Sequence, residues 1–81
     1  MLDSVTAEGL IKPHMRVVGA NDQEVGLVDH LEGRDLIKLV KDERGQHHYI
    51  PLAWVTSVDD KVHVDRAADE VRRQWQDSPT V

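Results

Sequence analysis

The hydrophobic residues of the chain fall into short runs that are separated by polar clusters containing glycine, aspartate or asparagine. Six such runs lie at residues 15–19, 25–32, 35–40, 47–52, 54–58 and 61–64. Each run is four to eight residues long and rich in valine, isoleucine and leucine, which is the length and composition typical of strands. The pattern therefore predicts a mainly β domain of about six short antiparallel strands.

The second and third runs predict a hairpin whose register can be checked. Gly33 lies at the first of the two residues between them, which predicts a loop of type II′ with Glu32 opposite Asp35. In that register Val28 faces Leu39, and both faces of the hairpin carry apolar side chains instead of one apolar and one polar face. Either a bulge shifts the alternation or both faces are covered.

After the sixth run the spacing of apolar residues changes from two to between three and four. Asp65 is a suitable N-cap, and Ala68, Val71 and Trp75 lie on one helical face. The sequence at residues 78–79 ends the predicted helix because of its proline. A helix this short is not stable alone, so we expect Trp75 to pack on the sheet or on a second copy of the chain.

The 81 residues are enough for one domain. Residues 1–12 lack a sustained period and are expected to form a flexible arm, with one helical turn around residues 4–8. Residues 13–76 are expected to form the domain, and residues 77–81 a frayed tail.

Composition excludes several classes of protein. The chain has no cysteine, so disulfides and thiolate metal sites are excluded. Its net charge is -5 and its ten Lys and Arg residues are scattered, which argues against binding to nucleic acid. We find no secretory signal and no run approaching the ~18 apolar residues of a membrane span, so a cytoplasmic protein without membrane contact is expected.

Two parts of the sequence resemble the PRC-barrel superfamily. Residues 18–28 (VGANDQEVGLV) resemble its opening hairpin, although its usual Asp-Gly turn is replaced here by Asp-Gln. Residues 49–52 with 55–59 look like its closing pattern, and residues 11–75 are similar to a family of small bacterial domains of unknown function within it. The resemblance implies a small half-open β-barrel with one C-terminal helix, acting mainly in protein–protein contact.

Histidine is the one unusual component of the composition. The chain has five histidines, namely His14, His30, His47, His48 and His63. A metal site would use His30, His48 and His63. Neighbouring residues 47 and 48 of a strand point to opposite faces, and the register places His30 and His48 roughly 11–12 Å apart, too far to share an ion. His63 could approach either one, so metal binding stays open as the alternative to a chain without metal or cofactor.

No residues combine in the way that catalysis requires. Ser4, Ser57 and Ser78 lie in the arm, within a strand and in the tail, without a strained elbow or an oxyanion loop. The carboxylate pairs at 42–43 and 59–60 are more simply solvated turn residues. We therefore expect a protein that is not an enzyme.

The remaining candidates are the side chains that could anchor an interface. Tyr49, Trp54 and Trp75 are the aromatic residues, and Val71 accompanies Trp75 on the helix. With two apolar sheet faces and a small core, the sequence predicts a bacterial protein–protein interaction module that associates with itself as a homo-oligomer. The alternative is a metal-binding or metal-sensing domain that uses histidines.

Overall fold

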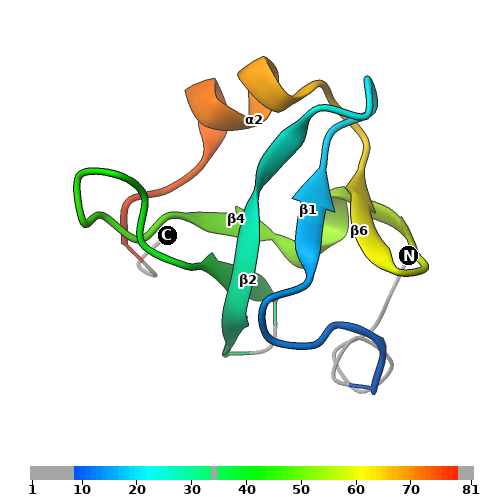
Figure 1. The fold of residues 1–81 in the computed structure, drawn as a ribbon, viewed down its shortest axis with the longest axis horizontal. Helices are drawn as coiled ribbons and strands as arrows, with labels where there is room; N and C mark the ends of the chain where they lie inside the picture. The colour runs from blue at the N-terminus through cyan, green and yellow to red at the C-terminus, as the bar shows by residue number, and fades with distance from the viewer. Residues whose placement is uncertain (1–8, 34, 79–81) are drawn as a thin grey trace.

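A computed structural model describes residues 9–33 and 35–78, which form a strongly curved sheet and one C-terminal α-helix (Figure 1). The elements in chain order are β1 (Arg16–Val18), β2 (Glu24–Glu32), β3 (Leu36–Leu39), β4 (Tyr49–Pro51), the 3-10 turn η1 (Leu52–Trp54), β5 (Val55–Val58), β6 (Lys61–Val64) and α2 (Ala68–Gln74). The predicted mainly β class with six short strands and a C-terminal helix is confirmed.

The six strands form one mixed sheet in the order β4-β3-β2-β1-β6-β5. All neighbouring pairs are antiparallel except β1 and β6, which are parallel. The prediction of a purely antiparallel arrangement is therefore wrong at this pair, because the long stretch of chain between β1 and β6 allows a crossover that a short hairpin does not. Among the described residues β4 and β5 do not pair, so the sheet is not closed into a barrel.

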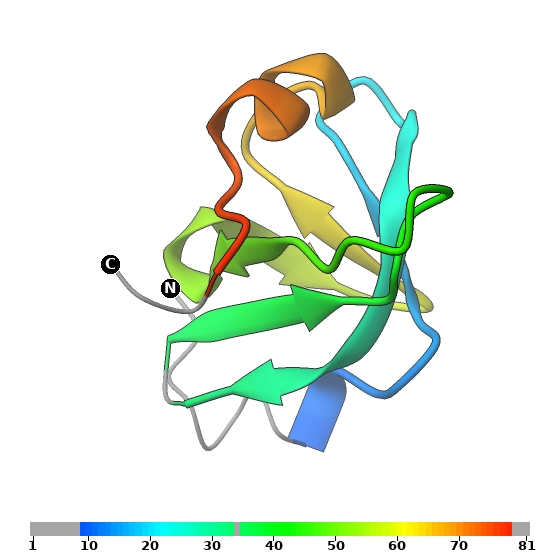
Figure 2. The same cartoon turned by 90° about the vertical axis from the view of Figure 1, so that its left-hand side faces the viewer.

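The long strand β2 connects the two halves of the sheet and bends between them (Figure 2). It pairs with β1 through its first half and with β3 through its second half. The register shifts once against each partner, which leaves Val25 and Asp29 as extra residues on β2. The shift at Val25 changes the alternation, so that Val25 and Val28 both belong to the core although they are three residues apart. Of the two alternatives left open for the hairpin, the structure shows the bulge, at Asp29.

The tip of the β2–β3 hairpin differs from the predicted register. Glu32 pairs with Leu36 instead of Asp35, so the predicted two-residue loop is wrong by one residue. The bulge at Asp29 absorbs this offset, and Val28 pairs with Leu39 as expected. Gly33 has a φ of 63°, the left-handed conformation that its position in the loop requires.

The core lies inside the curve of the sheet, under α2. The core cluster comprises Ile11, Val17, Val25, Val28, Ile37, Leu39, Ile50, Leu52, Val55, Val62, Val64, Ala68 and Val71. On β6 the predicted alternation is confirmed, because Val62 and Val64 are buried while His63 is half-exposed. Among the described residues, Leu10 is the one large hydrophobic side chain that is exposed, at 44%. The curvature therefore covers most of the apolar surface that the strand pattern would leave open.

Helix α2 is shorter than predicted. It begins at Ala68, with Ala67 as a cap that makes no side-chain hydrogen bond. The predicted N-cap Asp65 instead holds Arg66 through a contact of 2.7 Å between Oδ1 and Nε. Ala68 and Val71 are buried as the helical pattern predicted. The helix ends at Gln74 rather than near residue 78, because the chain turns back after Trp75 and pairs with β4 through Tyr49 and Gln76.

The packed structure extends further than the predicted domain limits. Ile11 is 5% exposed and belongs to the core, although the arm was expected to reach residue 12. At the other end, Asp77 contacts His48. The helical turn predicted around residues 4–8 and the last three residues of the predicted tail lie outside the described residues. In the part of the chain that is described, no helix is long and apolar enough to cross a membrane.

Candidate functional site

His48, directly before β4, and Trp75, directly after α2, form a stacked aromatic pair. Their ring centroids are 3.8 Å apart and the ring planes differ by 8°. His48 is 8% exposed, and its carbonyl accepts a hydrogen bond of 2.8 Å from the N–H of Leu39. The hydrogen bond places His48 opposite Leu39 on the neighbouring chain segment, as the extended register predicted.

Both ring nitrogens of His48 contact carboxylates. Nε2 lies 2.7 Å from Oδ2 of Asp42, and Nδ1 lies 3.0 Å from Oδ1 of Asp77. An ionised carboxylate only accepts hydrogen bonds, so both contacts are satisfied when both ring nitrogens carry a hydrogen. His48 thereby joins the start of β4 to the loop after β3 and to the segment after α2. We call these three residues and Trp75 the His48 clasp.

The carboxylate of Asp42 also organises its own loop. Its Oδ1 accepts hydrogen bonds from the backbone N–H groups of Arg44 (2.8 Å) and Gln46 (3.0 Å). The hydrogen bond from His48, followed by that from Gln46, lowers the pKa of Asp42 from its ordinary 3.8 to about 2. Gly45 takes a φ of 81° in this loop, a conformation that favours glycine. The charged form of Asp42 is therefore built into the clasp.

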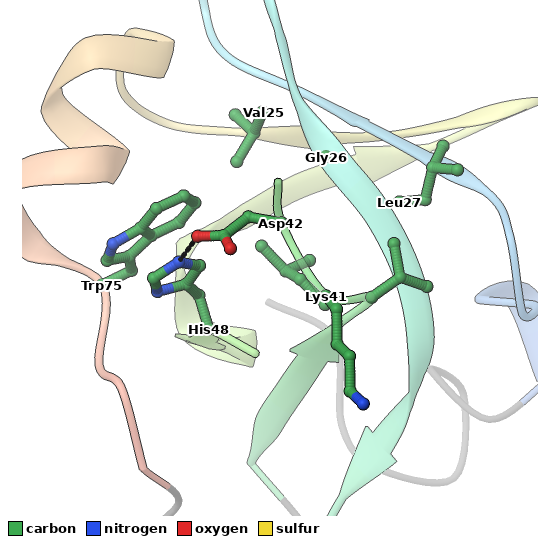
Figure 3. Close-up of a pocket in the computed structure, with 9 residues that line it drawn as sticks. Val25, Gly26, Leu27, Lys41, Asp42, His48 and Trp75 are labelled. Atoms are coloured by element: carbon green, nitrogen blue, oxygen red, sulfur yellow. Dashed lines mark hydrogen bonds and ion pairs between the residues drawn. The ribbon is translucent and has the colours of Figure 1, made fainter. Parts of the chain in front are cut away.

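A groove runs between the first half of β2, the segment after β3 and the indole of Trp75 (Figure 3). Its inner cavity has a volume of about 140 Å³ and is lined by Val25, Gly26, Leu27, Leu39, Val40, Lys41, Asp42, His48 and Trp75. A shallower outer part continues from it and adds Glu24, Glu43, Arg44 and Arg72. We call the two parts together the Trp75 groove.

The other histidines predicted as metal ligands have separate surroundings. The two ring nitrogens of His30 lie 3.4 Å from carboxylate oxygens of Asp29 and Glu32. Nε2 of His63 lies 3.0 Å from Oδ1 of Asp59. Within residues 9–33 and 35–78, no three His, Asp or Glu side chains are placed to hold a metal ion together.

Ser57, His63 and Asp59 come near one another at the β5–β6 hairpin. Ser57 pairs with His63 across the two strands, and the His63 ring contacts Asp59. Among the described residues no hydrogen bond joins the Ser57 hydroxyl to the His63 ring, and the hydroxyl of Thr56 donates to the backbone carbonyl of His63. The contact between nucleophile and base that a catalytic triad needs is not formed here.

The predicted interface residues divide into two pairs. Tyr49 and Val71 are buried in the domain itself. Trp54 and Trp75 are partly exposed, and the guanidinium of Arg66 lies 3.8 Å from the ring centroid of Trp54. Only the two tryptophans thus offer surface to a partner in this conformation. Sequence analysis missed the His48 clasp, since nothing in the local pattern relates residue 48 to residue 75.

The chain is similar to one family of bacterial proteins. No curated protein and no solved structure matches it. A family model described as "Uncharacterized protein conserved in bacteria (DUF2171)" matches residues 11–72, which include all six strands and most of α2. The chain therefore belongs to this family of uncharacterised bacterial proteins, DUF2171.

Proposed function

We propose that the domain is a non-enzymatic protein-interaction module that associates with itself. The observation that carries the proposal is the Trp75 groove, a concave surface whose inner part is largely apolar and walled by a partly exposed tryptophan. Sites of this kind, with apolar walls and a few fixed polar groups, are typical of binding surfaces. Tryptophan is also among the residues that contribute most to binding at interfaces.

The chemistry around the groove favours binding over turnover. The lining residues include no serine, threonine or cysteine that could act as a nucleophile. Of the lining groups that could transfer a proton, Asp42 and His48 bind each other at 2.7 Å. Their hydrogen-bonding capacity is used in holding the groove together, which leaves shape and charge as its means of recognition.

The resemblance to the PRC-barrel superfamily supports the same proposal at the level of fold. A six-stranded curved sheet with a C-terminal helix is compatible with a half-open barrel of that type. The resemblance implies a domain that acts mainly through protein contacts. Fold likeness alone is a weak argument for function, so the groove carries the proposal.

Self-association is supported by the size of the domain and by its two partly exposed tryptophans. The core of a chain of this length stabilises the folded domain by only roughly 3–5 kcal/mol, and small domains often gain stability from a partner copy. Trp54 contacts Arg66, which shortly precedes α2, whereas Trp75 directly follows α2. Covering either indole would add apolar burial that the monomer lacks.

Sedimentation equilibrium of the full chain, from micromolar to millimolar concentration, tests self-association. We expect a reversible dimer, together with concentration-dependent shifts of the indole N–H signals of Trp54 or Trp75 in NMR spectra. A monomer at every concentration with unchanged indole signals would refute self-association. The matched variant Trp54→His leaves the groove intact and reports whether the dimer uses the Trp54 side.

A further inference from the structure

The first half of β2 has an open edge where it borders the groove. Residues 24–27 pair with β1, whereas β3 pairs with the second half of β2. The N–H of Val40 donates to the carbonyl of Leu27 (2.9 Å), and beyond this bond the chain leaves β2. Among the described residues, β2 therefore has no strand neighbour over residues 24–26 on the side away from β1. An unpaired strand edge can accept a further strand from another chain.

Gly26 keeps the floor of the groove open at this edge. A Cβ atom added there would lie 3.7 Å from Cδ1 of Leu39, which is an ordinary van der Waals contact. Packing within the domain therefore does not by itself require glycine at this position. In Figure 3 the bare backbone of Gly26 passes between the side chains of Val25 and Leu27. A glycine within a strand often marks a place where a second backbone approaches closely.

The inner cavity has the size and lining for an apolar side chain. Its volume of about 140 Å³ lies below the roughly 300–1,000 Å³ of small-molecule sites, so it suits a single side chain better than a whole ligand. Val25, Leu27, Val40 and Trp75 supply apolar walls. The Trp75 ring is held in place by its stack on His48, so this wall is preformed and its ordering costs little on binding.

The outer part is lined by three basic side chains, Lys41, Arg44 and Arg72, and three acidic ones, Glu24, Asp42 and Glu43, so the charge it offers to a ligand depends on which of them are already paired. Nη2 of Arg72 donates to the carbonyl of Glu24 (2.7 Å), which fixes the guanidinium beside the open edge. Neither Arg72 nor Arg44 forms an ion pair with a described carboxylate. The carboxylates of Glu24 and Asp42 are engaged with Arg16 and His48, and Glu43 is the remaining acidic side chain in the lining.

From these features we infer that the Trp75 groove binds an extended acidic segment of a partner protein. The segment lies alongside residues 24–26 of β2, places one apolar side chain in the inner cavity and brings a carboxylate to Arg72 and Arg44. Arginine suits this role because its planar guanidinium can bind a carboxylate through two hydrogen bonds. The inference rests on the proposed interaction function and names the chemistry of the partner.

A library of random heptapeptides displayed on phage, selected against the full chain, tests the inference. We expect the selected sequences to share an apolar residue flanked by Asp or Glu. A synthetic peptide of that consensus should shift the NMR signals of Val25, Gly26 and the Trp75 indole. The same peptide with Lys in place of its acidic residues should bind about tenfold more weakly.

Two variants separate the apolar and the charged part of the site. Gly26→Val fills the floor of the cavity and should weaken binding of the consensus peptide by about tenfold or more. Arg72→Gln removes one guanidinium and should weaken it by about three- to tenfold. Arg73→Gln is the matched control, since Arg73 lies next in the helix but binds Glu70 and Asp69, and it should leave the affinity unchanged. Thermal unfolding of each variant verifies that it is folded.

Three results would overturn the inference. The first is a selection that yields no consensus sequence, and the second is a consensus of basic residues. The third is a set of peptides that bind Gly26→Val and Arg72→Gln as tightly as they bind the wild type. A dimer that Gly26→Val converts to a monomer would show that a second copy occupies the groove, which rejects the acidic segment but supports the proposed self-association. A monomer that binds the acidic consensus peptide would support the inference and reject self-association.

Discussion

The imidazole of His48 lies flat on the indole of Trp75, with 3.8 Å between ring centroids and 8° between ring planes. The stack brings together the start of β4 and the end of α2. Because His48 also binds Asp42 and Asp77, one side chain fixes the loop after β3 and the returning C-terminal segment. The Trp75 groove thus depends on a contact that lies outside both β-strand pairing and the central core.

Replacing His48 should destabilise the fold. His48→Ala removes the stack and two hydrogen bonds from a residue that is 8% exposed, so we expect a loss of about 2–4 kcal/mol in the free energy of unfolding. His48→Phe keeps an aromatic ring against Trp75 and should differ from His48→Ala by the stacking contribution, about 0.5–1.5 kcal/mol. Urea denaturation measures both.

The matched control for His48 is His63, whose ring binds the exposed carboxylate of Asp59. His63→Ala should change stability by less than about 1 kcal/mol, as is usual for an exposed pair. Equal losses for His48→Ala and His63→Ala would mean that the clasp adds nothing beyond a surface contact.

Stability should fall in acid through the clasp. The pKa of Asp42 is lowered to about 2 by its hydrogen bond from His48, whereas in the unfolded chain it returns to near 3.8. A carboxyl group with a lowered folded-state pKa contributes stability that is complete above the unfolded value and disappears as pH falls from about 4 to about 2. The midpoint of urea unfolding, measured across this range, should decrease.

The variant Asp42→Asn separates this contribution from others. It should be less stable than the wild type at neutral pH and should lose less stability between pH 4 and pH 2. Part of the acid dependence should remain, because the pKa of Asp59 is also lowered to about 2, mainly by the backbone N–H of Lys61 and then by His63. An unchanged acid profile in Asp42→Asn would contradict the role given to the Asp42–His48 bond.

Arg66 should stabilise the domain by packing on Trp54. Its guanidinium lies 3.8 Å from the Trp54 ring centroid, and Nη1 donates to Oε1 of Gln74 at 2.6 Å. Its pair with Asp65 lowers the pKa of Asp65. Arg66→Met should lower the free energy of unfolding by about 0.5–2 kcal/mol and shift the fluorescence of Trp54. Arg73 binds exposed partners, so Arg73→Met should lower the free energy of unfolding by less. Equal effects of the two variants would argue against the cation–π contact.

The sequence was sufficient for those parts of the fold that depend on local periodicity. The alternation of Val62, His63 and Val64 predicted which side chains of β6 are buried. The two apolar faces of the β2–β3 hairpin indicated a bulge, which lies at Asp29. Pro51, which lacks a backbone N–H to donate, lies in the edge strand β4, where such a residue is tolerated. In each case burial follows from neighbours one to four residues away.

The remaining features depend on contacts between distant residues. Nothing within Arg16–Val18 or Lys61–Val64 specifies that these strands run parallel, since both are short and rich in valine. The predicted cap at Asp65 failed because its carboxylate binds Arg66. Each member of the His48 clasp has an ordinary local explanation as a turn or strand residue, and only the folded chain brings them together.

The last prediction concerns the contact between β1 and α2 at Gly19. A Cβ atom on Gly19 would lie 2.9 Å from both the carbonyl carbon of Ala67 and the carbonyl oxygen of Arg66, and closer still to the backbone nitrogen of Ala68. These are backbone atoms, which cannot rotate away, so Gly19→Ala should force α2 off the sheet. We expect the free energy of unfolding to fall by about 1–3 kcal/mol or more. The helix carries Val71 and precedes Trp75, so the variant should also disturb the groove and shift the Trp75 indole signal in NMR spectra. Gly9→Ala is the control, because a Cβ on Gly9 meets nothing within 4 Å, and its urea midpoint should match that of the wild type. If Gly19→Ala were as stable as Gly9→Ala, the close approach of the helix to β1 would not constrain this position.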